Sequence, residues 1–400
     1  STRVRSSAAS DVYKRQEFNF HAPSFVVAGR NSVHQTGELL NQWGAGKNIM
    51  VVCGNKTYSL GLLNSLLDSI RSGGFTPCVF HGSLPDAPVE TVRSGITYAK
   101  EHDVSAIVAF GGGSAMDTAK AIACMLDVDG DIIAYCKGQI KPIRRSNLLF
   151  AIPTTCGTGS ESTDIGVVLD REANYKYIFA NPFAGPDVAI LDPVLLTALS
   201  PSMIAATAMD AFSHSAEAYT CKAANVMMEP LALASMEMIV KHLPAAMKEP
   251  GNLEELEQLL IASCMAGQAF TQVGLHLGHA IAHGVGVYGH VHHGTACALV
   301  LPYALSSVSE VIPDRIARIG KILGAEIQAQ AAPKEIGRIV SDSLQSFNRS
   351  IGIGRLSDYG VTEEQLDSMA EYAIHEGGTQ GNSFRPSPKA EVVELSLIHI

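Results

Sequence analysis

Residues 274–294 read GLHLGHAIAHGVGVYGHVHHG and contain six of the fourteen histidines in the chain. His279 and His283 are four residues apart, so on a helix both side chains lie on one face. The glycines from Gly284 onward are expected to end this helix and to lead into a second group of histidines. A histidine pair on an apolar helix is more often a hydrogen-bonded part of the core than a metal site, so the metal interpretation depends on further ligands.

A second pair of candidate ligands precedes this stretch, in the sequence MDAFSHSAE of residues 209–217. Asp210 and His214 are again four residues apart on an alanine-rich run that favours a helix, so a carboxylate and an imidazole share one face. Two such helical faces, where they meet, supply one oxygen and three nitrogens to a divalent cation. This set of ligands suits iron or zinc.

The two ends of the chain carry a pattern that protein termini do not share by chance. One codon spelling of DVYKRQ, residues 11–16, is the reverse complement of a spelling of LSLIHI, residues 395–400. We therefore expect residues 1–16 and 395–400 to derive from a sequencing adaptor, and the fold is argued from residues 17–394.

The composition, with 46% hydrophobic residues, is typical of a compact globular protein. The formal net charge is −10, and it becomes −13 when the four basic residues and one acidic residue of the adaptor-derived ends are left out. This balance argues against nucleic acid or a membrane surface as a partner. The eight cysteines are scattered without a CxxC motif, which favours a reducing cytoplasm, and no apolar run approaches the roughly 20 residues that span a bilayer.

The first half of the chain alternates between strand-like and helical patterns. Repeated β-α units of this kind indicate a parallel sheet with helices on both faces. Four short strands between residues 148 and 192 are expected to complete the sheet and to add a hairpin. Strands are predicted at 48–54, 76–80 and 105–110, and helices at 60–71, 89–101 and 115–125.

Nearly the whole chain after Pro193 is predicted to be helical. We therefore expect two domains, an α/β domain at 17–196 and an all-helical domain at 197–394. The predicted helices are 202–220, 227–246, 253–271, 277–285, 294–308, 312–323, 333–349 and 362–376.

Two polar loops follow predicted strands of the first domain. The loop GGGSAMDTAK, residues 111–120, lets the backbone turn sharply and opens a helix whose N-terminal N–H groups suit a phosphate. A tight strand-to-helix turn without a ligand would use glycine as well. The loop PTTCGTGSE, residues 153–161, places further polar groups at a strand end, and dinucleotides bind in crevices at such ends.

Taken together, these motifs resemble the iron-dependent (group III) alcohol dehydrogenases, which include lactaldehyde reductases, 1,3-propanediol dehydrogenases and butanol dehydrogenases. The resemblance runs from about residue 18 to residue 394. It implies an NAD(P)-binding, Rossmann-like α/β domain followed by an all-helical metal and substrate domain, the dehydroquinate synthase-like architecture. The matching motifs are GGGSAMDTAK, PTTCGTGSE, ILDP (190–193), MDAFSHSAEAY (209–219) and GHAIAHGVG with HHGTACALVLP (278–302).

The resemblance implies the ligands of the metal. The family's aspartate and three histidines fall on Asp210, His214, His279 and His293, and its further pocket histidine falls on His283. His292 is the alternative to His293, but the family's ligand directly precedes a glycine, as His293 precedes Gly294. The unmatched His276 and His290 are expected to be solvated or core residues.

The resemblance also implies the residues that bind the cofactor. The family's groups around the pyrophosphate and the nucleotide fall on Asp86, Gly112, Gly113, Ser114, Asp117, Thr154, Thr155, Thr158 and Lys176. Lys176 has an alternative interpretation as an ordinary exposed strand lysine.

The chain departs from the family pattern at three places. Asn55 follows the first strand where the family often has an acidic residue that repels the 2′-phosphate of NADP, so NAD is expected and NADP is possible. Cys156 replaces the usual alanine and Ala208 the usual glycine, and both leave the ligands in place. Fe²⁺ is the expected metal with Zn²⁺ possible, and a homodimer or higher homo-oligomer is expected.

The implied chemistry is reversible hydride transfer between a primary alcohol or diol, or the corresponding aldehyde, and NAD(P). His283 could relay the alcohol proton, because imidazole titrates near neutral pH. One alternative is a lyase resembling dehydroquinate synthase, whose phosphorylated, carboxylated substrate requires several arginines or lysines. Between 209 and 303 the only basic residues besides histidine are Lys222, Lys241 and Lys248. The other alternative is a non-catalytic nucleotide-binding relative, which would show a lost ligand.

Overall fold

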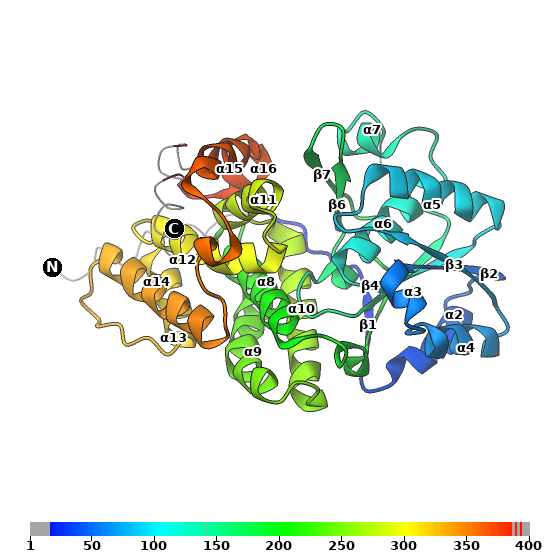
Figure 1. Ribbon diagram of the computed structural model, residues 1–400, viewed down its shortest axis with the longest axis horizontal. Helices are drawn as coiled ribbons and strands as arrows, with labels where there is room; N and C mark the ends of the chain where they lie inside the picture. The colour runs from blue at the N-terminus through cyan, green and yellow to red at the C-terminus, as the bar shows by residue number, and fades with distance from the viewer. Residues whose placement is uncertain (1–16, 142, 386–388, 390–392, 394–400) are drawn as a thin grey trace. The chain divides into compact units, whose positions relative to one another are not determined.

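The computed structural model describes residues 17–141, 143–385, 389 and 393, so the predicted adaptor-derived ends lie outside the described residues (Figure 1). The chain divides into two compact units. One contains a parallel sheet and comprises residues 21–199 and 251–271. The other is helical and comprises 200–250 and the described residues from 272 onward, together with 17–20.

The sheet unit is built on six parallel strands in the order β1-β8-β5-β4-β2-β3. The central strands are short apolar runs, as buried parallel strands require, and all six residues of Ala106–Gly111 are buried. The predicted fold class is therefore confirmed for this unit. The strands are β1 (Phe25–Ala28), β2 (Asn48–Gly54), β3 (Thr76–Ser83), β4 (Ala106–Gly111), β5 (Leu148–Pro153) and β8 (Val188–Leu191).

Alternation of side chains along β2 gives the sheet two separate cores. Ile49 and Val51 pack on one face, in the apolar cluster that includes the helices α2 (Thr36–Gln42) and α4 (Asn64–Ser72). Met50 and Val52 pack on the opposite face, against α5 (Val89–Glu101), α6 (Gly113–Met125) and α7 (Ile132–Cys136). Figure 1 shows these two groups of helices on opposite sides of the sheet.

Two strands predicted between residues 148 and 192 lie outside the main sheet. β6 (Ile165–Asp170) and β7 (Tyr175–Ala180) pair antiparallel as the expected hairpin. The unit is completed by α3 (Asn55–Ser59), by α10 (Leu253–Val273), most of which belongs to this unit, and by three 3₁₀ helices: η1 (Ser32–Gln35), η2 (Ser160–Ser162) and η3 (Pro193–Leu196). The predicted domain limits of 17–196 and 197–394 did not anticipate the return of α10 to the sheet unit, and the assignment of domains stays a prediction.

The helical unit is organised around α8 (Pro201–Thr220). Its N-terminus is capped by Ser200, whose Oγ accepts a hydrogen bond from the backbone N–H of Met203, and Pro201 takes the first helical position. All residues from 204 to 220 are buried, so this helix forms the centre of its unit. Around it are α9 (Glu229–Lys248), α11 (Leu277–Gly289), α12 (His293–Val308), α13 (Pro313–Ile322), α14 (Pro333–Ser350), η4 (Leu356–Tyr359), α15 (Glu363–His375) and α16 (Gly377–Asn382).

The prediction that the glycines from Gly284 onward end the histidine helix is wrong, because α11 continues to Gly289. Gly284 is buried against α15, and a Cβ added there would lie 2.5 Å from the carbonyl oxygen of Met369. The glycine thus permits close packing of two helices, and this tertiary contact outweighs the roughly 1 kcal/mol that glycine costs in a helix. Among the residues that the structure describes, no helix combines the length and apolar character needed to cross a membrane.

Candidate metal centre and cofactor loops

Three polar residues line one face of α8. Asp210, His214 and Glu217 follow one another at intervals of four and three residues, which places them on the same side of a helix. Helices α11 and α12 both pack in this region, and α12 contacts both α8 and α11. The meeting of these three helices brings together the residues that the sequence singled out.

The carboxylate of Asp210 lies at the centre of three imidazoles. Its Oδ1 is 3.8 Å from Nε2 of His214, 3.8 Å from Nε2 of His279 and 3.6 Å from Nε2 of His293. The side chains of Asp210, His214 and His279 are almost completely buried, and that of His293 is one-third exposed. All four predicted ligands are therefore brought together.

These separations fit a bound divalent cation. Ligand atoms about 2.0–2.1 Å from a tetrahedral metal are ~3.4 Å from one another, close to the measured values. The buried Oδ1 of Asp210 has no hydrogen-bond partner within the described part of the chain. A buried carboxylate oxygen is normally satisfied, so this orphaned atom is accounted for by a cation between it and the ring nitrogens.

Glu217 fixes the orientation of His279. Its Oε1 is 2.7 Å from Nδ1 of His279, and its Oε2 accepts the backbone N–H groups of His276 at 2.9 Å and His279 at 3.3 Å. From this hydrogen bond we assign the proton to Nδ1, which directs the lone pair of Nε2 toward Asp210. Gly278 leaves the room for this carboxylate, because a Cβ there would lie 2.4 Å from Oε1.

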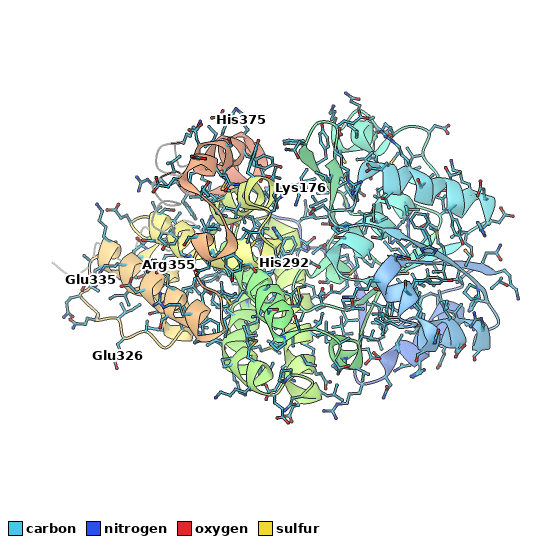
Figure 2. All side chains as sticks on the ribbon, in the orientation of Figure 1. Lys176, His292, Glu326, Glu335, Arg355 and His375 are labelled. Carbon is cyan, nitrogen blue, oxygen red and sulfur yellow. The ribbon has the colours of Figure 1, made fainter. Side chains whose placement is uncertain are left out.

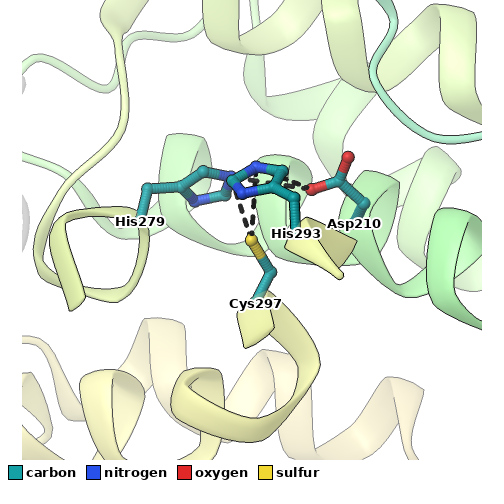
Figure 3. A group of neighbouring side chains, drawn as sticks. All are labelled: Asp210, His279, His293 and Cys297. Atoms are coloured by element: carbon teal, nitrogen blue, oxygen red, sulfur yellow. Dashed lines mark hydrogen bonds and ion pairs between the residues drawn. The ribbon is translucent and has the colours of Figure 1, made fainter. Parts of the chain in front are cut away.

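Cys297 joins the centre from α12, one helical turn after His293. Its Sγ lies 3.6 Å from Nε2 of His279 and 3.6 Å from Nε2 of His293 (Figure 3). The ligand atoms of Asp210, His279, His293 and Cys297 all lie within 4.8 Å of one another. His214 is outside this compact group of four, but its ring stacks on that of His279 with centroids 4.7 Å apart.

The charges of the centre favour a cation. Burial by itself raises the pKa of Asp210, but the neighbouring imidazoles hold that pKa well below its usual range. Glu217 follows the same pattern, since burial is outweighed by His279 and His276 and the pKa is lowered. Burial raises the pKa of the Cys297 thiol to about 12. The two buried carboxylates lie at opposite nitrogens of the His279 ring, Asp210 at Nε2 and Glu217 at Nδ1, so positive charge in this region stabilises both.

His283 lies beside the candidate ligands with a carboxylate of its own. Its ring stacks on His293 with centroids 5.3 Å apart, and its Nδ1 is 2.7 Å from Oε1 of Glu376. Glu376 is buried and also accepts a hydrogen bond from Thr379. A proton on Nδ1, assigned from this contact, leaves Nε2 of His283 able to accept another.

The other histidines of residues 274–294 are exposed or in the core. His292, labelled in Figure 2, is exposed at the N-cap of α12, whereas the adjacent His293 faces Asp210. His276 is a core residue whose Nε2 is 2.8 Å from the hydroxyl of Thr220. His290 is exposed and follows the end of α11 in the left-handed conformation.

The cofactor residues predicted from the sequence all belong to the sheet unit. Strand β3 lies on one side of β2 in the sheet. The next strands of the chain, β4 and then β5, lie on the other side of β2. The order therefore reverses between β2 and β4, and ligands bind outside the carboxyl ends of the strands at such a switch point. Asn55 is exposed directly after β2, and Gly112 follows β4.

The two polar loops contact each other at adjacent strand ends. The backbone N–H of Thr154 bonds to the carbonyl of Gly111 at 2.9 Å. A Cβ on Gly112 would lie 3.3 Å from Thr155, and one on Gly113 would lie 2.7 Å from Thr158. Both glycines thus make room for threonine side chains, and the first N–H groups of α6 are left at this edge.

Asp86, Ser114 and Lys176 form a small polar group in the same unit. Lys176, labelled in Figure 2, extends from β7 to Oδ1 of Asp86 at 2.8 Å, and the backbone N–H of Asp86 bonds to the hydroxyl of Ser114 at 3.1 Å. Asp86 has a φ of 62°. Aspartate adopts this left-handed conformation more readily than most residues, because its short polar side chain forms local hydrogen bonds.

Asp117 has contacts different from those of the other candidates. Its Oδ1 accepts the hydroxyl of Ser160 at 2.8 Å and its Oδ2 accepts the backbone N–H of Val167 at 3.1 Å. Lys120, on the same helix, donates to Thr163 and to the carbonyl of Ile165, each at 2.8 Å. These contacts tie α6 to the segment after the second loop, so they indicate a positioning role, and cofactor binding by Asp117 stays a prediction.

Three neighbours of the candidate ligands escaped the sequence interpretation: Glu217, Glu376 and Cys297. Glu217 was detectable, because it continues the face of Asp210 and His214 within the quoted motif. Cys297 is four residues after His293 and was detectable by the same spacing. Glu376 carries no such signal, since 93 residues separate it from His283.

Comparison with known proteins gives matches along nearly the entire chain. The family described as "Iron-containing alcohol dehydrogenase" matches residues 23–193, and the one described as "Fe-containing alcohol dehydrogenase family, C-terminal" matches residues 204–397. The chain is 32% identical to the NAD-dependent methanol dehydrogenase of Bacillus methanolicus over 91% of its length and 95% of the relative. It is 30% identical to the NADPH-dependent butanol dehydrogenase of Clostridium saccharobutylicum, over 91% and 93%.

The fold is also similar to a solved structure. A crystal structure of 1,3-propanediol oxidoreductase superposes with a TM-score of 0.89 at 28% identity, and the match covers 96% of this chain and all of the other. These matches do not favour the lyase alternative or a non-catalytic relative.

Proposed function

Because this chain belongs to the iron-containing alcohol dehydrogenase family, we propose that the centre around Asp210 binds its metal and that the loops after β2, β4 and β5 bind NAD. The protein is a metal-dependent oxidoreductase of alcohols and diols, and its cofactors are NAD and Fe²⁺. The observation that carries the metal assignment is the orphaned, buried Oδ1 of Asp210 amid three imidazole nitrogens.

Asp210, His214, His279 and His293 would hold the metal. A divalent cation bound there supplies Lewis acidity, which polarises the oxygen of an alcohol or aldehyde. Glu217 keeps the Nδ1 proton of His279 and so keeps Nε2 available as a ligand. The nearly complete burial of Asp210, His214 and His279 keeps water away from three of these four side chains, which strengthens their electrostatic interactions.

His283 would hold and move the proton of the substrate hydroxyl. Glu376 accepts the Nδ1 proton of His283 and stabilises the ring when Nε2 takes a second proton. The stacking of His283 on His293, one of the proposed ligands, supports this role. His283 is thus the proposed general base for oxidation and the general acid for reduction.

We expect His283→Ala to lower kcat by about 100-fold or less, because water can replace a proton relay. The metal content should stay at the wild-type level, because this substitution removes none of the proposed ligands. Steady-state kinetics across pH and metal analysis of the purified protein measure this. His290→Ala, an exposed histidine in the same segment, serves as the control. Loss of metal from the His283→Ala protein would show that His283 is a ligand and that the assignment is wrong.

The proposed function is tested on the Fe²⁺-loaded protein with methanol, butan-1-ol and 1,3-propanediol and with their aldehydes. Reduced cofactor absorbance reports hydride transfer in both directions. Metal-dependent turnover of at least one of these pairs is expected. A protein that binds iron and NAD but turns over none of them would contradict the proposed range of substrates.

Asn55 gives an expectation about the choice of cofactor. An asparagine at this position can accept a hydrogen bond from the ribose 2′-hydroxyl, but it cannot repel a 2′-phosphate. We propose that NAD is used with relaxed discrimination, so Asn55→Asp should raise the ratio of kcat/KM for NAD over NADP by about 10-fold or more, chiefly by weakening NADP. An unchanged ratio would show that Asn55 does not face the ribose.

We also propose a cytoplasmic location and a homo-oligomeric state. All eight cysteines are free thiols, which is typical of a reducing compartment. β1 is one of the two edge strands of the sheet and carries the exposed Phe25, a feature that a second subunit would cover. Light scattering of the purified protein measures the mass of the assembly.

A further inference from the structure

The sulfur of Cys297 has an unusual set of neighbours. Sγ lies 3.6 Å from Nε2 of both His279 and His293, two of the proposed ligands of the metal. The residue is buried and projects from the same face of α12 as His293 (Figure 3). Cys297 therefore contacts the centre at the same atoms as Asp210 does.

The partners of this sulfur differ from those of a cysteine that packs as a small apolar side chain. Sγ of Cys297 is equally distant from two ring nitrogens, both on side chains that also surround Asp210. Cys221, a buried cysteine of the same unit, makes contacts of the usual kind to backbone carbonyls, at 3.3 Å to Ala218 and 3.8 Å to Val273. The equal distances at Cys297 indicate a common point toward which sulfur and both nitrogens are directed.

The separations match metal coordination by sulfur. With a metal–sulfur distance of about 2.3 Å and metal–nitrogen distances of about 2.0–2.1 Å, a sulfur–metal–nitrogen angle of about 110° places sulfur ~3.6 Å from each nitrogen. The measured separations are both 3.6 Å. Oδ1 of Asp210 and Sγ of Cys297 also satisfy the common limit of 4.8 Å for the group.

We propose that Cys297 is a sulfur ligand of the metal, in addition to the carboxylate and imidazole ligands. This proposal rests on the proposed metal centre and assigns it a further donor atom. Coordination replaces the S–H bond by a metal–sulfur bond, and the proton leaves to solvent without any change in oxidation state. Asp210, His279, His293 and Cys297 would then form one compact set of donors, and His214 lies beside it, 3.8 Å from Oδ1 of Asp210 and stacked on His279.

A sulfur ligand has a consequence for metal selectivity. Thiolate is softer than carboxylate or imidazole, and it favours Zn²⁺ and Co²⁺ relative to Fe²⁺. Replacement of Cys297 by serine should therefore weaken Zn²⁺ binding more than Fe²⁺ binding. We expect the ratio of the two affinities to fall by about 10-fold or more, measured by competition with a chromophoric chelator under anaerobic conditions.

The direct test uses Co²⁺ as the probe. The full chain is loaded with one Co²⁺, and its absorption spectrum is compared with those of Cys297→Ser and of the control Cys221→Ser. We expect a thiolate-to-cobalt charge-transfer band in the near ultraviolet in the wild-type and Cys221→Ser proteins, and its loss in Cys297→Ser with the visible ligand-field bands retained. A band that persists in Cys297→Ser would overturn the proposal.

A second measurement uses only the wild-type protein, so it does not require any variant to fold. X-ray absorption of the wild-type protein loaded with Zn²⁺ should show one sulfur at about 2.3 Å beside nitrogen and oxygen at about 2.0–2.1 Å. A shell of nitrogen and oxygen alone would overturn the sulfur ligand and leave the metal centre standing. A different result would overturn both the metal centre and the sulfur ligand: the wild-type protein does not bind one metal ion per chain, and Asp210→Ala binds as much metal as the wild type.

Discussion

Asp210→Ala is expected to abolish the metal-dependent activity and to leave a folded protein. The substitution removes the oxygen Oδ1, which lies within 3.8 Å of all three ring nitrogens. Loss of a residue that merely orients a ligand lowers metal affinity by about 10–100-fold, so loss of this ligand should lower it by at least ~100-fold. Metal analysis and turnover of the Fe²⁺-treated protein measure both effects.

Thermal unfolding separates this effect from misfolding. A metal present at 100 times its dissociation constant stabilises the native state by about 2.7 kcal/mol, so Fe²⁺ should raise the Tm of the wild-type protein and not that of Asp210→Ala. With a chelator present, the two proteins should melt at similar temperatures. Ser213→Ala is the control, because Ser213 is a buried polar residue of the same helix that bonds only within it, to Met209. If Asp210→Ala contained as much metal as the wild-type protein, Asp210 would not be a ligand of the metal.

The sheet was largely predictable, because its strands are continuous apolar runs and its helices have a clear period. Asn48–Gly54 and Val89–Glu101 have the predicted bounds. The short edge strand Phe25–Ala28 was not predicted, since four half-exposed residues carry little periodic signal and gain their strand structure from pairing with β8. The grouping of α10 with the sheet unit is equally a matter of tertiary contacts, such as the packing of Gly267 against Gly159.

The candidate site was predictable where it depends on helical spacing and on family motifs. The pairs Asp210 with His214 and His279 with His283 each lie on one helical face, and the structure brings them together. The choice of His293 over His292 came from the resemblance, and the structure places only His293 near Asp210. Neither spacing nor composition predicts that Glu376 reaches His283 from a distant part of the chain, because that contact depends on the packing of α15 against α11.

Gly294→Ala is expected to damage the metal centre without removing any ligand. Gly294 follows His293 at the start of α12, where this helix packs on α8. A Cβ at this position would lie 2.2 Å from the carbonyl oxygen of Ala206 and 3.1 Å from Cβ of Asp210. The backbone oxygen cannot rotate away as a flexible side chain would, so α12 has to move and His293 moves with it.

The expected size of the effect follows from this displacement. Overpacking of a filled interior costs about 1–3 kcal/mol, so the Tm of the chelator-treated protein should fall. A shift of about 1 Å in a catalytic group can cost ~100-fold in rate, and kcat should fall by a similar factor together with the affinity for Fe²⁺. Activity, metal titration and thermal unfolding of the same preparation measure the three quantities.

Gly286→Ala is the matched control for Gly294→Ala. Gly286 is a helical glycine of the same unit, but a Cβ there would meet only the carbonyl of Val291, at an ordinary 3.8 Å. Alanine is favoured over glycine in a helix by about 1 kcal/mol, so Gly286→Ala should be at least as stable as the wild type and as active. Equal behaviour of the two variants would show that the close contact between α12 and α8 does not position His293. A loss confined to Gly294→Ala would establish that the absence of a side chain at residue 294 allows an imidazole from one helix to reach a carboxylate on another.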